Sequence, residues 1–133
     1  MKIILVEDEA IAMRKMKRLL LEIRPNAVIV AELESVQEAK EWLVKHDSNT
    51  ADLVFSDIQL SDGLSFEIFE NKDFHLPVVY ATAYSKYTSR AFHANGISYL
   101  HKPIQKEDLA KTIAHFEAKD DKVIYKLKRS TLL

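Results

Sequence analysis

Short runs of apolar residues alternate along the chain with longer stretches in which apolar residues recur every three or four positions. The apolar runs contain almost no polar residue, which is typical of strands that are buried on both faces. They predict five strands, at residues 3–6, 27–31, 53–55, 77–81 and 97–100.

Each predicted strand is followed by a stretch with the spacing of a helix. Residues 10–24 carry apolar side chains three and four positions apart, and Pro25 stops that helix. Ser35 and Glu38 have the spacing of a capping box, which predicts a helix over residues 35–46. The remaining helices are expected near residues 64–71, 87–94 and 105–117.

Alternating strands and helices predict an α/β fold with one parallel sheet covered on both faces. We expect a doubly wound, flavodoxin-like (βα)5 sandwich with right-handed crossovers and the strand order 2-1-3-4-5. The predicted domain spans residues 1–118. The segment 119–133 begins as a polar linker and then alternates as a strand does. It is either a linker or the start of a further domain, or a terminus that packs on the first.

The composition limits the classes of protein to which the chain can belong. The chain has 133 residues, 47% hydrophobic and 29% charged, which suits one domain and excludes extensive disorder. No apolar run approaches the roughly 20 residues of a membrane helix, and residues 1–6 are too short for a signal peptide core. We therefore expect a cytoplasmic protein with no membrane contact.

The chain contains no cysteine, which excludes disulfides, thiolate metal sites and cysteine nucleophiles. The five histidines show no metal-ligand spacing. With 20 acidic and 19 basic residues, the chain lacks the basic surface of a nucleic-acid-binding domain. Any contact with DNA is expected to belong to a separate domain.

Chemically active side chains follow four of the predicted strands at their carboxyl ends, where ligands bind in open parallel sheets. These residues are Glu7, Asp8, Asp57, Thr82 and Lys102. Three neighbouring carboxylates repel one another unless a cation intervenes, and Mg²⁺ prefers such oxygen ligands. A carboxylate nucleophile beside a metal, a lysine and a hydroxyl suits phosphoryl transfer.

Each of these residues also has a plainer explanation. Asp57 could cap a turn, and Glu7 and Asp8 could interact with the dipole of the first helix. Thr82 could cap the following helix, and Lys102 could be solvated. The occurrence of all of them at one edge of one sheet favours the phosphoryl-transfer site.

Four motifs resemble the signature of response regulator receiver domains in two-component systems. They are ILVEDE at residues 4–9, DIQL at 57–60, TA at 82–83 and YLHKP at 99–103. The resemblance covers residues 1–118 and implies that Asp57 is the phosphorylated aspartate. It implies that Asp8 binds Mg²⁺ directly, that Glu7 acts mainly through water, and that the backbone carbonyl of Gln59 completes the metal site.

The resemblance also assigns the phosphoryl-binding and switch residues. Thr82 matches the switch hydroxyl, Tyr99 the switch aromatic and Lys102 the phosphoryl-binding lysine, and the bond before Pro103 is expected to be cis. Two positions depart from the family pattern. Glu7 stands where aspartate is commoner, which lengthens one acidic arm, and Ser61 stands where many relatives carry proline.

Residues 57–65 and 82–84 resemble receivers of the LytTR class, in which a DNA-binding domain follows the receiver. The resemblance implies a sensor histidine kinase as phosphodonor, and DNA binding only through an output domain absent from this sequence. It also implies a homodimer through the face formed by the fourth helix, fifth strand and fifth helix. Tyr87, Phe92 and Tyr99 are the candidates for exposure on that face, with a buried position as the alternative.

The expected function is a phosphoacceptor switch, which is not an enzyme beyond its own phosphotransfer and dephosphorylation. There are two alternative functions. A dehalogenase-like phosphatase would carry its nucleophile after the first strand, with a second aspartate two residues on. Asp57 follows the third strand and precedes Ile58 and Gln59. A pseudo-receiver that never takes phosphate is disfavoured by the intact set of acidic, threonine and lysine residues.

Overall fold

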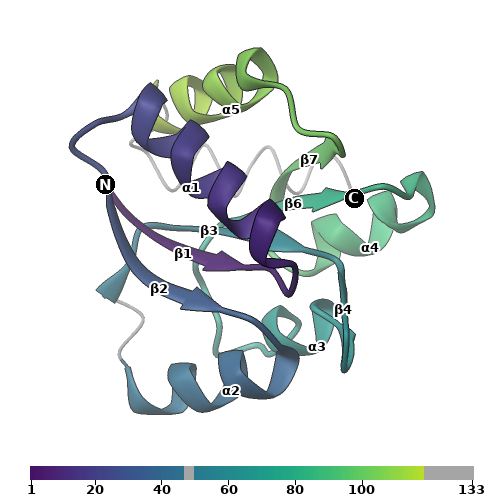
Figure 1. The fold of residues 1–133 in the computed structure, drawn as a ribbon. Coiled ribbons are helices and arrows are strands. Elements are labelled where there is room, and N and C mark those ends of the chain that lie inside the picture. Colours follow the sequence, from purple (N-terminus) through teal and green to yellow (C-terminus); the bar gives the residue numbers. More distant parts are fainter. Residues whose placement is uncertain (47–49, 119–133) are drawn as a thin grey trace.

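The computed structural model describes residues 1–46 and 50–118, which form a sheet between two layers of helices (Figure 1). All neighbouring strands of the sheet are parallel, in the order β2-β1-β3-β6-β7. The strands are β1 (Lys2–Val6), β2 (Val28–Leu33), β3 (Leu53–Asp57), β6 (Val78–Thr82) and β7 (Gly96–His101). Because β6 and β7 are the fourth and fifth strands of this sheet, the predicted order 2-1-3-4-5 is confirmed.

The helices cover both faces of the sheet, as the continuous apolar strands predict. They are α1 (Ala10–Ile23), α2 (Val36–Lys45), α3 (Phe66–Phe69), α4 (Thr88–His93) and α5 (Lys106–Ala118), with a 3-10 turn η2 (Ser85–Tyr87). Ile3 and Leu5 pack with residues of α1 and α5, whereas Ile4 and Val6 pack with residues of α2 and α3. Successive side chains of β1 thus supply two separate cores. No helix within the described residues is long and apolar enough to cross a membrane.

The prediction of a helix near residues 64–71 is wrong in its length. It is the single turn α3, and it follows a small antiparallel hairpin of β4 (Gln59–Leu60) and β5 (Gly63–Leu64). Gly63 has a φ of +148°, a conformation that side chains with a Cβ rarely adopt, and it allows the chain to turn back there. The hairpin begins two residues after Asp57, and it therefore belongs to the neighbourhood of the carboxyl edge.

Asp62, at the turn of this hairpin, caps α2. Its two carboxylate oxygens accept hydrogen bonds from the backbone N–H groups of Val36 at 2.8 Å and Gln37 at 3.0 Å. The predicted cap is also present, since the Ser35 hydroxyl accepts from the N–H of Glu38 at 3.0 Å. The bonds from Val36 and Gln37 lower the pKa of Asp62, because they favour its charged form.

The turn between α4 and β7 determines the position of the last strand, β7. Asn95 adopts a left-handed conformation with a φ of 64°, and its side-chain amide donates to the carbonyls of Phe69 at 2.9 Å and Phe74 at 3.2 Å. A Cβ on Gly96 would lie 2.4 Å from the carbonyl oxygen of Ala91, so only glycine fits there. This turn sets where β7 begins, and Lys102 directly follows the other end of that strand.

A buried serine supplies a stability test. Ser65 is fully buried, and its hydroxyl has no hydrogen-bond partner among the described residues. We expect Ser65→Ala to raise the free energy of unfolding by about 1 kcal/mol, because an unsatisfied buried hydroxyl is removed. Urea denaturation followed by circular dichroism measures the change.

The matched control is Ser35→Ala, which removes the hydroxyl that caps α2. This variant should lower the free energy of unfolding by about 1 kcal/mol. A Ser65→Ala protein that is less stable than the wild type would contradict the assignment of an unsatisfied hydroxyl.

Candidate functional site

The acidic side chains expected at the carboxyl edge of the sheet come together there. Glu7 and Asp8 follow β1, and Asp57 ends β3, its neighbour in the sheet. Each of the three residues offers a carboxylate oxygen, and these oxygens all lie within 4.8 Å of one another. Chain segments about 50 residues apart in sequence thus form one acidic cluster, and its oxygen donors suit a divalent cation such as Mg²⁺.

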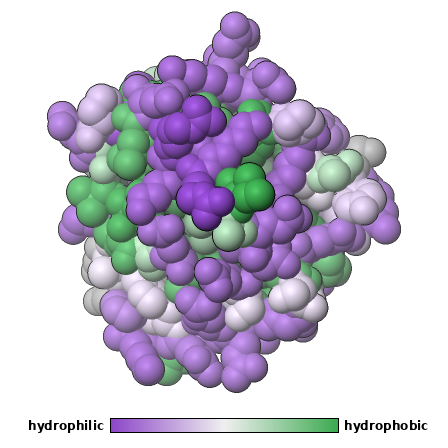
Figure 2. Space-filling model, in the orientation of Figure 1, coloured by the Kyte–Doolittle hydropathy of each residue, from purple (hydrophilic) through white to green (hydrophobic). Residues whose placement is uncertain are grey.

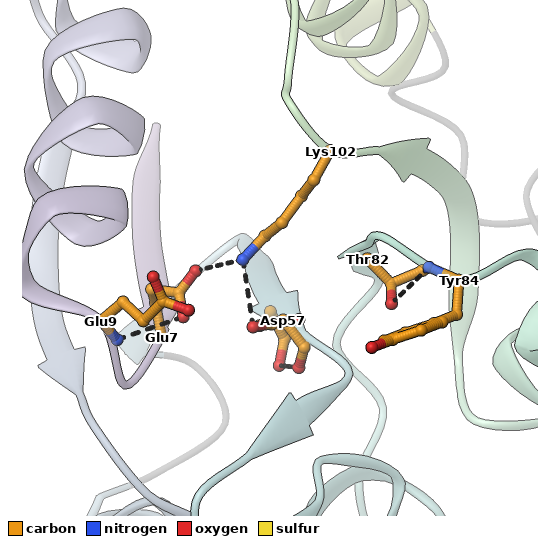
Figure 3. A network of polar contacts seen from close by, with 7 residues as sticks. Glu7, Glu9, Asp57, Thr82, Tyr84 and Lys102 are labelled. Carbon is orange, nitrogen blue, oxygen red and sulfur yellow. Dashed lines mark hydrogen bonds and ion pairs between the residues drawn. The ribbon is translucent and has the colours of Figure 1, made fainter.

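Lys102 reaches into this cluster from the end of β7 (Figure 3). Its Nζ lies 2.6 Å from Oε1 of Glu7 and 3.1 Å from Oδ2 of Asp57. Burial alone would lower the pKa of Lys102, but the hydrogen bond to Glu7 and the charge of Asp57 outweigh it. The pKa of Lys102 is consequently raised above its ordinary value of 10.5, and the ammonium stays charged.

Asp8 is the carboxylate whose charge is least compensated. Burial raises the pKa of Asp8, and the hydrogen bond and negative charge of Glu7 raise it further. Hydrogen bonds from the backbone N–H groups of Asp8 and Ser61 act in the opposite direction without reversing the shift. A cation beside Asp8 would relieve this unfavourable charge, so the donor set fits a metal ion.

Thr82 and Tyr99, the two residues matched to a switch, both contact Tyr84. Thr82 is buried at the end of β6, and its hydroxyl accepts a hydrogen bond from the N–H of Tyr84 at 3.2 Å. The Tyr99 hydroxyl donates to the carbonyl oxygen of Tyr84, and burial raises the pKa of Tyr99. No role for Tyr84 was predicted beyond its place in the stretch 82–84 that resembles LytTR-class receivers, because its contacts arise from the fold.

Gln59 contributes a contact that the sequence did not predict. Its side-chain amide lies 3.2 Å from the hydroxyl of Tyr87, to which it donates. Tyr87 packs its ring against Phe66, with 5.8 Å between ring centroids. The Gln59 side chain therefore connects β4, beside the acidic cluster, to the start of α4.

The sequence profile of the response regulator receiver domain matches residues 3–114. The chain belongs to the response regulator receiver family. It is 37% identical over 120 residues to the sensory transduction protein LytT of Bacillus anthracis, a match that covers 88% of this chain and 47% of the relative. LytR of Staphylococcus epidermidis is 33% identical over 125 residues, 92% of this chain and 48% of the relative. The receiver thus spans about half the length of these curated relatives.

Solved structures of receivers share the fold. The response regulatory domain of mrkE from Klebsiella pneumoniae superposes with a TM-score of 0.76 at 24% identity, covering 89% of this chain and 96% of that one. A two-component response regulator from Clostridium difficile gives a TM-score of 0.74 at 24% identity, covering 89% and 96%. The predicted doubly wound architecture is therefore shared by other proteins of this kind.

A pocket of about 450 Å³ opens beside Asp57. Glu7, Asp57 and Lys102 line its polar end, and its walls are mostly apolar side chains of α1, the sheet and the segment before α5. Ile11, at the beginning of α1, also lines the pocket and is 75% exposed. Figure 2 shows hydrophobic residues exposed among hydrophilic ones on the face of the molecule that carries α1.

The sequence left open whether the aromatic residues of the α4–β7–α5 face are exposed or buried. Tyr87, Phe92 and Tyr99 are all partly buried, and Tyr87 and Tyr99 pack against a core. Tyr84, which was not among the candidates, is 50% exposed. The peptide bond between Lys102 and Pro103 is cis, the conformation that the resemblance implies.

Proposed function

We propose that this receiver accepts a phosphoryl group on Asp57 from a sensor histidine kinase, with Mg²⁺ bound, and thereby switches an output domain. The observation that carries the proposal is the position of the Asp57 carboxylate, within 4.8 Å of Glu7 and Asp8 oxygens and 3.1 Å from Nζ of Lys102. In this step an oxygen of Asp57 attacks phosphorus, the bond from phosphorus to the histidine nitrogen breaks, and the nitrogen keeps the electron pair.

The contacts of the carboxylates support a division of roles at the metal. One oxygen of Glu7 accepts from Lys102 at 2.6 Å and the other accepts from the N–H of Glu9 at 3.3 Å. Since both oxygens of Glu7 are engaged, Asp8 and Asp57 would hold the ion directly, with the carbonyl of Gln59, and Glu7 would act through water. Bound Mg²⁺ would supply positive charge to neutralise the phosphoryl oxygens.

Tyr84 couples the two switch residues in this proposal. A phosphoryl group on Asp57 offers oxygens to the Thr82 hydroxyl, which turns away from the Tyr84 N–H to donate to them. The same loop residue holds the Tyr99 hydroxyl through its carbonyl. Displacement of the loop therefore releases Tyr99 to turn inward, and phosphorylation shifts the balance between two states of the α4–β7–α5 face.

The pocket beside Asp57 is proposed as the docking site of the kinase. A histidine kinase must bring its phosphohistidine within bonding distance of Asp57, and the pocket is lined by both Asp57 and the exposed Ile11. An apolar wall next to the reacting carboxylate would exclude water from the transfer. A cytoplasmic location, in which such a kinase presents its phosphohistidine, is part of the proposal.

The output belongs to a part of the protein beyond the receiver. Residues 119–133, which lie outside the described residues, are proposed as a linker or the start of a LytTR-type DNA-binding domain, and the receiver's relatives are about twice its length. Control of transcription would then act through DNA contacts of that domain alone. The proposed homodimer face combines α4, β7 and α5. Tyr84 lies in the loop between β6 and η2, accepts from the Tyr99 hydroxyl of β7, and is half-exposed.

Labelling with a small phosphodonor tests the acceptor. We expect the chain incubated with acetyl phosphate and Mg²⁺ to gain one acid-labile phosphoryl group, and Asp57→Asn to gain none, by intact-protein mass spectrometry. Asp52→Asn is the matched control, since Asp52 precedes the other end of β3 and accepts from the N–H of Lys2 at 2.8 Å. Undiminished labelling of Asp57→Asn moves the acceptor elsewhere, and an unlabelled wild type indicates a pseudo-receiver.

Removing Lys102 tests whether lysine and metal share the same carboxylates. We expect Lys102→Met to bind Mg²⁺ more tightly by a factor of about ten, equivalent to ~1.4 kcal/mol of lost charge repulsion. Its labelling by acetyl phosphate should slow. Isothermal titration with MgCl2 measures the affinity. Lys106→Met, whose Nζ pairs with Glu22 at 3.1 Å, removes the same charge and should leave the affinity unchanged. Weaker binding by Lys102→Met would contradict the shared site.

A further inference from the structure

We infer that Asp62 is a positioning residue for the acidic site: by fastening the turn of the β4–β5 hairpin to α2, it holds the backbone of Gln59 and Ser61 in place beside Asp8. This inference rests on the proposed function, because it concerns how the same site is prepared for a cation. It assigns Asp62 a task separate from that of the metal ligands themselves.

The hairpin has little stability of its own. It contains two residue pairs, Gln59 with Leu64 and Leu60 with Gly63, joined by a turn at Ser61 and Asp62. A two-stranded hairpin this short does not hold its position in water without outside contacts. Leu60 is buried in the core and Leu64 packs against it, which holds the two strands. The position of the turn depends on the groups to which it is attached.

One attachment runs to α2. The bonds from Val36 at 2.8 Å and Gln37 at 3.0 Å use both oxygens of Asp62, and their N–H groups are among those that a helix cannot satisfy internally. Because the acceptor is charged and lies at the positive end of the helix dipole, these bonds are stronger than neutral ones. The turn is thus anchored to a ten-residue helix that packs on the sheet.

The other attachment runs to the acidic site. The hairpin begins at Gln59, two residues after Asp57, and the backbone N–H of Ser61, the neighbour of Asp62, interacts electrostatically with the Asp8 carboxylate. Gln59, at the base of the hairpin, supplies the proposed carbonyl ligand and ties its own side chain to Tyr87 at 3.2 Å. The hairpin therefore lies between α2, to which Asp62 attaches it, and the acidic site, which begins two residues before Gln59.

Loss of the Asp62 bonds has a specific consequence. α2 keeps its second cap, the hydroxyl of Ser35, but the turn of the hairpin loses its anchor and must be ordered when the cation binds. The ordering opposes binding, so the affinity for Mg²⁺ falls. By linkage, Mg²⁺ must in turn stabilise the bonds from Val36 and Gln37 to Asp62.

The experiment compares three alanine variants by isothermal titration with MgCl2. We expect Asp62→Ala to weaken Mg²⁺ binding by a factor of about three to ten, within the usual range of coupling between sites. Ser35→Ala removes the other cap of the same helix and should lower stability without changing the affinity. Asp73→Ala removes one negative charge from an exposed position elsewhere and should also bind as the wild type does.

A second measurement separates positioning from helix capping. Hydrogen exchange of the Val36 and Gln37 amides should slow when Mg²⁺ is added to the wild type, and should not respond in Asp8→Asn, which lacks a proposed ligand. Wild-type affinity in Asp62→Ala, or an equal loss in Ser35→Ala, overturns the inference and leaves the proposed function intact. A wild-type chain that binds no Mg²⁺ overturns both.

Discussion

The ammonium of Lys102, held between the carboxylates of Glu7 and Asp57, makes the acidic edge of the sheet possible. The side chains of Glu7 and Asp57 are only 9% and 10% exposed, and buried charges without a partner cost several kcal/mol each. The compensating charge comes from the last strand, more than 90 residues after Glu7. The turn at Asn95 and Gly96, which sets where β7 begins, is consequently as necessary to the site as the residues that form it.

The order of the strands and the residues at their ends were predictable because they follow from local periodicity and one topological rule. Buried parallel strands appear as apolar runs, and their carboxyl ends share an edge, so Asp57 and Lys102 could be placed together without coordinates. The family resemblance implied that Glu7 acts mainly through water. Its direct pairing with Lys102 was missed because the pairing depends on the length of two side chains that meet across the two intervening strands, β3 and β6.

The parts that sequence did not predict are those fixed by contacts between distant segments. Asp62 lies 26 residues from Val36, and nothing in the local pattern around Asp62 indicates that its carboxylate caps α2. The expected helix over residues 64–71 was too long because Gly63 and Leu64 pair with β4. The exposure of Tyr87 and Phe92 was undecided for a related reason, since α4 has six residues, too few for periodicity to define a buried face.

The acidic cluster is left with more negative charge than Lys102 can balance. Three carboxylates face one ammonium, and the raised pKa of Asp8 is where the excess appears. A neutral edge would be more stable, but it would not attract a cation. The excess negative charge is therefore better explained as a property of a cation-binding site than as a defect of packing. A phosphoryl group on Asp57 would add negative charge on the side of Lys102 away from Glu7. Lys102 would then divide its hydrogen bonds among more acceptors, and the 2.6 Å bond to Glu7 is the contact that phosphorylation would weaken first.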